Sequence, residues 1–426
     1  MKKAQVVFVA VLLIATSLLF AGGKSEQVGG PVTLKVANYA LLEAGYEDFW
    51  NQIKVDFEAK NPDVAIEWIT APYGEIVNQV VNMAGGGNKV DVIFGEIGWV
   101  PGLVDADLAA PIEDVLSSSF IDDFYPDVLK SFEVEGKPYA IPLYISPYVI
   151  YYNKDLFVQA GLDPEKPPRT YDEMLAYAEK LSKLKDPQGN KVYAFGQTTA
   201  SVPVSGSSLN AMIFNFGGKI LDDAGKLSVD NQGFKDTFDM IQRLDRLGYN
   251  PQNAKLKDLR NLFALGQLAI YYDQSWGFNG VQSINPDAAR FTASAEPLRG
   301  GAGEGLSLLQ AHCFILVDNG AARKDAASRF VEHVISKEAL NDYLRDITPA
   351  YPAKYSMADM EGVVNNGVLK GASPAAGKVQ SQVFIPQLSD LNLELCALAQ
   401  AVTVGNEDVN SAIARFKQAA MVKIGQ

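Results

Sequence analysis

The first part of the chain alternates between strand-like and helix-like segments. Residues 33–38 alternate apolar and polar side chains, which is typical of a half-buried strand. Residues 45–60 space large apolar side chains four apart, so that they share one face of a helix. Further strands are predicted at 64–69 and 90–94, with a helix over 73–84 between them. This order predicts a parallel sheet with helices packed on its faces.

The ends of these strands predict where a ligand would bind. In sheets of this kind ligands lie beyond the carboxyl ends of the strands. We therefore expect the loops that follow Asn38, Ile69 and Phe94 to line a site.

The segment from residue 136 to 161, GKPYAIPLYISPYVIYYNKDLFVQAG, predicts a buried strand that leaves one globular unit, or lobe, and enters another. Pro142 and Pro147 bracket this crossing and limit its bending, so we expect Ser146 in or beside the bending point. Beyond it, Thr170 and Glu173 predict a capping box for a helix over 171–185.

Later segments predict two more crossings. A strand over 313–317 and a helix over 321–344 look like additions to the first lobe. The segment TPAYP at 348–352 is the expected third crossing, before C-terminal helices at 392–404 and 409–420. The predicted fold class is α/β, with two doubly wound lobes. We assign residues 1–21 to a leader, residues 22–144 plus 294–347 to lobe I, and residues 145–293 plus 348–426 to lobe II.

Length and composition agree with two soluble lobes. A chain of 426 residues is longer than one hydrophobic core usually serves. Apolar residues make up 48% and charged residues 20% of the chain, which is typical of globular proteins. The net charge of −13 and the scattered basic residues argue against a nucleic-acid partner.

Residues 1–21 have the parts of a cleaved export signal. Lys2 and Lys3 precede an apolar run over 6–20 and small residues, and we expect cleavage after Ala21. A membrane anchor is the alternative, but the run is shorter than the roughly 20 apolar residues that a span requires. No cysteine lies near the junction to carry a lipid. We therefore expect a soluble protein in the periplasm.

The residues that usually mark catalysis or metal binding are sparse. His312 and His333 are the chain's two histidines, and we interpret His312 as a core residue. No GxSxG motif and no metal-ligand spacing appears, so we expect no catalytic residues, no metal and no cofactor. Cys313 and Cys396 could form a bridge in an oxidising compartment, but two buried free thiols are the favoured interpretation.

Several segments, in order, resemble the family-one extracellular solute-binding proteins of ABC importers, the group that contains maltose-binding protein. The longest of them is the crossing quoted above, followed by TYDEMLAYAEKL. The others are DVIFGEIGWVPGLVDADLAAPIEDV before it, and NAMIFNFGGKILDD, GQLAIYYDQSWGF and AASRFVEHVISKEALNDYL with TPAYPA after it. The resemblance covers essentially the whole chain after the leader. It implies a periplasmic binding protein type II fold, with three hinge crossings and a ligand held between the lobes.

The resemblance also implies site residues by position. Trp276 stands where sugar binders place a stacking aromatic, and Phe278 where a second aromatic occurs. Ser207 and Asn210 occupy a contributing loop of lobe II, and Glu96 and Trp99 follow the third strand of lobe I. The chain departs from the pattern at Asn392, where maltose-binding protein has a tryptophan, which argues against a long glucose polymer.

These residue types suit a sugar, which presents an apolar face and a rim of hydroxyls. Aromatic rings supply flat surfaces, and carboxylates and amides supply hydrogen bonds. Glu96 is the preferred carboxylate, although a helix cap or solvent exposure is its alternative role. Four tyrosines at strand ends or in the crossing are further candidates: Tyr39, Tyr73, Tyr144 and Tyr148. Trp50 and Trp68 are expected in the core.

The function expected from the resemblance is capture of a mono- or short oligosaccharide by a monomer and delivery to an ABC permease in the membrane. Glycerol phosphodiesters, polyols and uronates are alternative ligands, although we can place no Arg or Lys in the cleft for an anion. Ferric iron is another, because Tyr151–Tyr152 and Tyr271–Tyr272 resemble phenolate pairs, yet adjacent strand residues face opposite ways. An exported carbohydrate-active enzyme is the remaining alternative.

Overall fold

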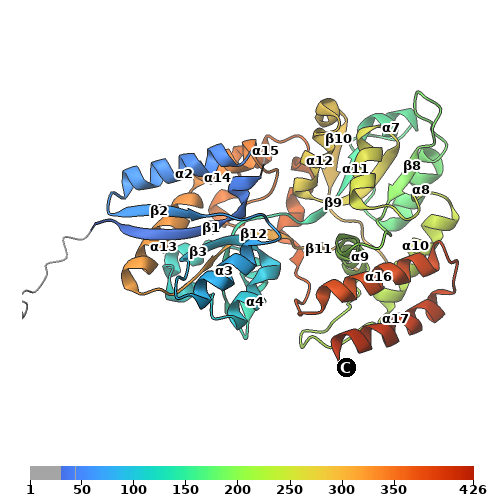
Figure 1. Cartoon of the computed structure of the whole chain (residues 1–426). Helices are drawn as coiled ribbons and strands as arrows, with labels where there is room; N and C mark the ends of the chain where they lie inside the picture. Colours follow the sequence, from blue (N-terminus) through green and yellow to red (C-terminus); the bar gives the residue numbers. More distant parts are fainter. Residues whose placement is uncertain (1–29, 44) are drawn as a thin grey trace, which may run out of the picture.

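The computed structural model describes residues 30–43 and 45–426, and Figure 1 shows two lobes side by side. The expected leader lies outside these residues. Lobe I contains a five-stranded sheet in the order β2-β1-β3-β12-β6, whose strands are β1 Val32–Asn38, β2 Val64–Ile69, β3 Val92–Glu96, β6 Ala140–Ile145 and β12 Ala311–Leu316. β1 runs parallel to β2 and β3, as predicted, whereas β12 is antiparallel to both β3 and β6.

The helices of lobe I, where η marks a 3₁₀ helix, cover both faces of this sheet (Figure 1). They are η1 Tyr39–Leu42, α2 Glu47–Lys60, α3 Ile76–Gly85, η2 Ile97–Trp99, α4 Val100–Asp105, η3 Ile112–Asp114, α5 Ser118–Ile121, α6 Pro126–Lys130, α13 Ala321–Val334, α14 Lys337–Asp346, η6 Tyr355–Met357 and α15 Glu361–Val364. A further 3₁₀ helix, η7 Lys370–Gly377, follows α15 and packs on the sheet of lobe II. A small hairpin, β4 Glu133–Val134 and β5 Lys137–Pro138, precedes β6.

Lobe II contains a mixed four-stranded sheet in the order β10-β7-β9-β8. Its strands are β7 Tyr148–Asn153, β8 Tyr193–Gly196, β9 Leu268–Gln274 and β10 Thr292–Ala295. β8 and β9 are parallel, while β7 is antiparallel to both β9 and β10. Its helices are α7 Lys154–Gln159, α8 Tyr171–Leu181, α9 Pro203–Asn215, α10 Gln232–Arg246, α11 Leu256–Ala264, η4 Ser275–Gly277, α12 Phe278–Gln282, η5 Pro286–Arg290, α16 Leu388–Val402 and α17 Val409–Ile424.

Local signals explain where several helices begin. The side chain of Thr170 accepts a hydrogen bond from the Glu173 amide at 3.1 Å, so the predicted cap of α8 is confirmed. Glu173 reaches back one residue further than a capping box requires, to the Arg169 amide at 2.7 Å. The single helix predicted over 321–344 is two helices, because Ser336 caps α14 by accepting from the Ala339 amide.

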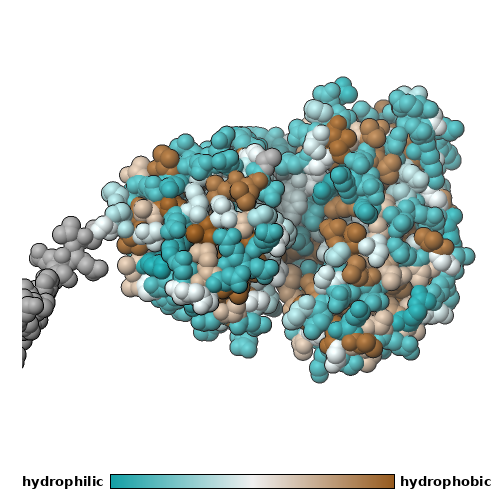
Figure 2. Space-filling model, in the orientation of Figure 1, coloured by the Kyte–Doolittle hydropathy of each residue, from teal (hydrophilic) through white to brown (hydrophobic). Residues whose placement is uncertain are grey.

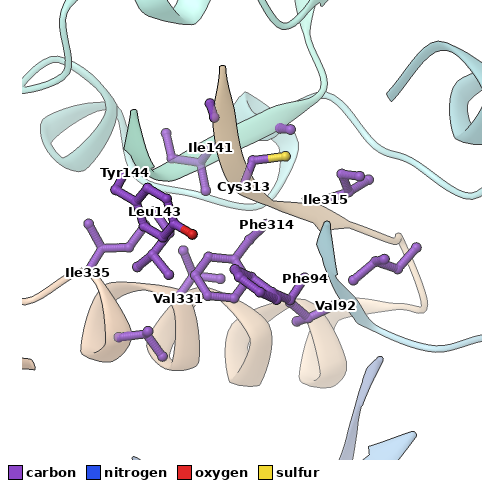
Figure 3. Packing of buried hydrophobic residues seen from close by; sticks show 14 of the residues in the cluster. Val92, Phe94, Ile141, Leu143, Tyr144, Cys313, Phe314, Ile315, Val331 and Ile335 are labelled. Carbon is purple, nitrogen blue, oxygen red and sulfur yellow. The ribbon is translucent and has the colours of Figure 1, made fainter. Parts of the chain in front are cut away.

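Each sheet has its own core. In lobe I, Figure 3 shows apolar side chains of β3, β6 and β12 packed against α13. Trp50 is fully buried in this core and Trp68 packs against it. In lobe II the two faces of the sheet form separate clusters. Cys313 lies in the first core and Cys396 in the second, and both are free thiols, as the favoured interpretation expects.

The packing moves two of the predicted lobe boundaries. β10 pairs with β7 in the second sheet, and Leu308 still packs in the second core, so residues 294–308 do not join lobe I as expected. Tyr351 exchanges backbone hydrogen bonds with Ile145 and is buried in the first core, so residues 348–352 are not the third crossing. Val368, Ala372 and Ala375 pack in a core cluster of lobe II. We propose lobe I as residues 30–145 plus 309–367, and lobe II as residues 146–308 plus 368–426.

Ser146 lies in the first crossing, where it contacts the second crossing and the start of η4. It is fully buried, and its amide donates to the Gln310 carbonyl at 2.7 Å. Its hydroxyl lies 2.8 Å from that of Ser275. Bending at this residue stays a prediction.

Over residues 30–43 and 45–426, none of the helices combines the length and apolar character needed to span a membrane.

Candidate ligand-binding site

A cleft of about 900 Å³ lies between the lobes, and Figure 2 shows the molecule hollowed there. Lobe I lines it with the segment that follows β3, through η2 and α4. Lobe II lines it with α9, α11, η4 and α16. The residues that line it include Tyr73, Glu96, Trp99, Asp105, Ser207, Lys257, Arg260, Gln274, Trp276, Gln382, Phe384 and Asn392. The cleft therefore draws on both lobes.

Glu96, the last residue of β3, places its carboxylate in the cleft. It precedes η2 but its side chain makes no capping bond, so the alternative role as a helix cap is not observed. The Tyr73 hydroxyl donates to Oε2 at 2.9 Å, and Nε2 of His312 lies 3.3 Å from Oε1. Burial acts to raise the pKa of Glu96, but the nearby imidazole and both hydrogen bonds outweigh it and hold the pKa below its usual value. The carboxylate is therefore an ionised acceptor at neutral pH.

Aromatic rings surround this carboxylate. The ring centroids of Tyr39, Tyr73 and Trp99 lie 5.1 to 5.8 Å apart in edge-to-face and tilted arrangements. Trp99 lies directly over Gly95, where a Cβ atom would come within 2.4 Å of the indole. Glycine at position 95 is thus required for the tryptophan to lie against the end of the strand.

Trp276 forms the floor of the cleft at the junction of the lobes. It follows β9, and its amide donates to Ser146 Oγ at 3.2 Å. Its ring stacks on His312 of lobe I with centroids 5.1 Å apart and planes 19° apart, and Tyr144 meets it edge-on. The indole is half-buried and lines the cleft, which leaves flat surface for a ligand.

The wall from lobe II carries a guanidinium and two unsatisfied amides. Arg260 binds Asp273 through two hydrogen bonds of 2.6 and 2.8 Å, and Asp273 is fully buried. Burial acts to lower the pKa of Arg260, but the Asp273 charge outweighs it and raises the pKa. Gln274 Oε1 and Asn392 Oδ1 are buried and find no hydrogen-bond partner among the described residues. These oxygens are acceptors available to a ligand.

Asn392 lies where two helices of lobe II touch. Gly206 of α9 packs so closely on α16 that a Cβ at position 206 would lie 2.4 Å from the Asn392 Cβ. A short amide beside a glycine contact therefore stands at the position where the family resemblance would place a tryptophan.

The segment Val379–Pro386, which we term the strap, separates this cleft from a second compartment of about 700 Å³. The two spaces share Ile97, Pro101, Gln382 and Phe384. Phe384 packs on the first core, while its neighbours Val383 and Ile385 pack on the second. The strap therefore contacts both lobes, and together the compartments form an elongated space.

The structure brings most of the predicted site residues together. Tyr73, Glu96, Trp99, Ser207 and Trp276 line the cleft, whereas Tyr39, Tyr144 and Tyr148 lie behind its lining. Tyr39 and Tyr144 contact His312, and the Tyr148 hydroxyl accepts a hydrogen bond from Gln274 at 3.1 Å. Asn210 is buried beside the strap and donates to Gln382 at 3.2 Å. Ligand contact by each of these residues stays a prediction.

Phe278 neither lines the cleft nor lies directly behind its lining. It begins α12, is 5% exposed, and packs near Tyr151 in the lobe II core. Residues two apart in a helical turn point about 200° apart. The turn that aims Trp276 at the cleft therefore aims Phe278 away from it.

Sequence reasoning missed Arg260, Lys257, Gln274 and the strap. Asp273 directly follows the apolar run of its strand, and a buried carboxylate requires a partner. That signal could have predicted a basic residue nearby, but not which one. Nothing in the sequence indicated that the strap would return to the cleft.

The tyrosine pairs do not form an iron site in this cleft. Tyr151 and Tyr271 stack on each other in one core cluster, and Tyr152 and Tyr272 lie in the other. The Tyr151 hydroxyl already donates to the Ser275 carbonyl at 2.6 Å. Among the described residues no group of three or more His, Cys, Asp or Glu side chains is arranged to hold a metal ion.

Two α/β lobes with a cleft that both of them line define a two-lobed binding protein. The model of the bacterial extracellular solute-binding protein family matches residues 52–370, and the chain belongs to that family. The predicted family resemblance is thereby confirmed.

Relatives and solved structures agree with this assignment. A putative binding protein of Brucella abortus is 24% identical over 281 residues, covering 65% of this chain and 66%, just under two thirds, of that relative. The mannitol-binding protein of Pseudomonas aeruginosa is 26% identical over 329 residues, covering 72% of this chain and 67% of the relative.

Among solved structures, the cyclic alpha-maltosyl-1,6-maltose binding protein from Arthrobacter globiformis has a TM-score of 0.80 at 20% identity, covering 93% of this chain and 99% of that chain. The sugar-binding protein MalE from Xanthomonas citri has a TM-score of 0.78 at 16% identity, covering 92% and 98%. These similarities confirm the predicted fold class.

Proposed function

We propose that this protein captures a short carbohydrate between its lobes and delivers it to the permease of an ABC importer. The observation that carries the proposal is the composition of the cleft. Flat aromatic surfaces from both lobes, Trp99 and Trp276, lie beside acceptors that have free capacity, namely Glu96, Gln274 and Asn392. Sugar hydroxyls are donors that fit such acceptors, and the apolar face of a sugar ring fits an aromatic ring.

The charge of the cleft favours a neutral ligand over a uronate or a phosphodiester. Arg260 is paired with Asp273 in a two-bond contact, which leaves its charge compensated. Lys257 is exposed at the rim, and Glu96 and Asp105 contribute two carboxylates on the opposite wall. An anion would meet this acidic wall without a dedicated cation.

The size of the cleft supports a ligand of one to a few sugar units. Ligand sites commonly enclose about 300–1,000 Å³, and the main cleft of about 900 Å³ lies within that range. Charge-assisted hydrogen bonds contribute about 1.5–3 kcal/mol each and neutral ones about 1 kcal/mol. A handful of such contacts reaches the roughly −8 kcal/mol of micromolar affinity after ordering costs.

Relatives support the same ligand class. Mannitol-binding and maltotriose-binding proteins are among those that the chain resembles, and the latter, from Pyrococcus abyssi, is 25% identical over 258 residues. The family and its relatives are binding proteins, and we propose that this chain likewise carries out no chemistry. We also propose export to the periplasm after removal of residues 1–21, and action as a monomer.

A thermal-shift screen followed by calorimetry tests the proposal. The panel contains mannitol, maltotriose, diacetylchitobiose and arabinooligosaccharides. Ligand at 100 times its dissociation constant adds about 2.7 kcal/mol of stability, which raises the melting temperature by about 5–11 °C for a lobe-sized unit. At the same ligand concentration Trp276→Ala should reduce the shift to about half or less, while Tyr355→Ala, an exposed aromatic away from the cleft, should preserve it.

Two results would contradict the proposal. The first is the absence of any shift across the panel and a wider set of carbohydrates. The second is the appearance of cleaved products when the protein is incubated with the oligosaccharides, which would indicate an enzyme.

A further inference from the structure

His312 lies on β12 beneath the cleft and contacts groups from both lobes. Its side chain is 14% exposed. Nε2 lies 3.3 Å from Glu96 Oε1 and 3.2 Å from the Tyr39 hydroxyl. Nδ1 forms a hydrogen bond with the Tyr144 hydroxyl. Both ring nitrogens are therefore engaged.

The chemistry of these partners determines which nitrogen carries a proton. A carboxylate only accepts hydrogen bonds, so Nε2 donates to Glu96. Burial raises the pKa of Tyr39 and of Tyr144, so both hydroxyls keep their protons at neutral pH. The Tyr144 O–H can therefore donate to Nδ1 of His312. Glu96 on β3, Tyr39 on η1 and Tyr144 on β6 are the titratable groups that contact the imidazole among the described residues.

The face of the same ring supports the indole of Trp276. The two rings are nearly parallel, with centroids 5.1 Å apart. Trp276 enters from lobe II, whereas His312 belongs to lobe I. The imidazole thus touches both the carboxylate and the stacking surface, one through its edge and the other through its face.

We propose that His312 is a positioning residue of the binding site, which orients the Glu96 carboxylate through Nε2–H and fixes the plane of the Trp276 ring by stacking. This role rests on the proposed function, because it concerns the same cleft. Restraining both groups before the ligand arrives reduces the entropy lost on binding. The interpretation of His312 as a purely structural core residue predicts no such role.

The test separates the edge of the ring from its face. His312→Phe keeps an aromatic ring beneath Trp276 but removes both nitrogens. His312→Gln loses the stacking but keeps an N–H donor for Glu96 and an acceptor for Tyr144. We expect His312→Phe to weaken binding of the tightest carbohydrate of the panel by about ten- to a hundredfold. His312→Gln should regain most of the affinity that depends on the Glu96 contact, because it keeps a donor for that carboxylate.

A double-mutant cycle with Glu96→Gln shows whether His312 acts through the carboxylate. In the Glu96→Gln background, His312→Phe should cause no further loss beyond about twofold, since the charged group that it orients is gone. An equal loss in both backgrounds would overturn the proposal. Melting curves of the ligand-free variants identify any general damage to the fold.

A measurement without ligand decides the matter independently of the carbohydrate. In protein carrying ¹³C-labelled glutamate, the carboxyl signal that is absent from Glu96→Gln reports the titration of Glu96. Its midpoint should move to higher pH in His312→Phe, and should lie between the wild-type and His312→Phe values in His312→Gln, which keeps a hydrogen-bond donor but not the charge. An unchanged midpoint in His312→Phe overturns the proposal even if the protein binds carbohydrate. If no carbohydrate binds but the midpoint moves, the proposed function fails while the positioning of Glu96 by His312 stands.

Discussion

Replacing Asp273 by alanine is predicted to destabilise lobe II and to loosen one wall of the cleft. Asp273 is fully buried and accepts two hydrogen bonds from Arg260, at 2.6 and 2.8 Å. It also accepts from the Gln274 amide at 2.8 Å. Removing the carboxylate leaves the guanidinium without its counter-charge beside a buried strand.

The structure sets the size of the effect. Breaking a buried ion pair by removing one partner typically costs about 3–5 kcal/mol. The Arg260 side chain is 23% exposed and can turn toward the water in the cleft, which favours the lower end, about 3 kcal/mol. For a unit of lobe size each kcal/mol corresponds to about 2–4 °C, so we expect the melting temperature of lobe II to fall by about 6–12 °C.

Calorimetric melting of the ligand-free protein measures this shift. The matched control is Asp359→Ala, which breaks an exposed pair with Lys337 and should leave the melting temperature nearly unchanged. Carbohydrate affinity should also fall in Asp273→Ala, because Arg260 lines the cleft. A shift in Asp273→Ala no larger than in Asp359→Ala would refute the reasoning.

Three further predictions concern the floor and the wall of the cleft. Gly277→Ala should cost about 1–3 kcal/mol of stability through overpacking and so lower the melting temperature, because a Cβ there would lie 2.2 Å from the Asp273 carboxylate. An unchanged melting curve would contradict this. Trp276→Ala should weaken carbohydrate binding by about tenfold or more, with partial recovery in Trp276→Phe, and equal affinities by calorimetry would exclude a stacking role. Because the pKa of Glu96 lies below its ordinary value of 4.5, affinity should stay constant down to that pH and fall only below it; a loss that begins above about pH 5.5 would show that another group controls binding.

The spacing of apolar residues predicted the fold correctly where contacts are local or lie between consecutive elements. The parallel pairing of β1 with β2 and β3 matches the predicted strand–helix order. Boundaries between the lobes could not be predicted in the same way. Tyr351 pairs with Ile145 across about 200 residues of chain, and β10 adds to the edge of the second sheet. Such long-range pairings leave no periodic signal in the sequence.

The candidate site was predicted as far as strand ends and aromatic residues could indicate it. Glu96 and Trp276 were predicted from their positions in the family resemblance, and the predicted strand end after Phe94 also indicated Glu96. The roles of Arg260 and His312 depend on contacts with elements remote in sequence, Asp273 for the first and Glu96 for the second. The strap was missed because its apolar residues alternate between two cores, a pattern that also fits an ordinary edge strand.

A crystal structure of the protein with the tightest-binding carbohydrate of the panel tests the central claim most directly. The account predicts a sugar ring between the lobes that stacks on Trp276 and donates hydroxyl hydrogen bonds to Glu96. It also predicts at least one contact from Gln274 or Asn392 of the opposite wall. A carbohydrate bound outside the cleft, or held by one lobe alone with the other wall untouched, would contradict the account.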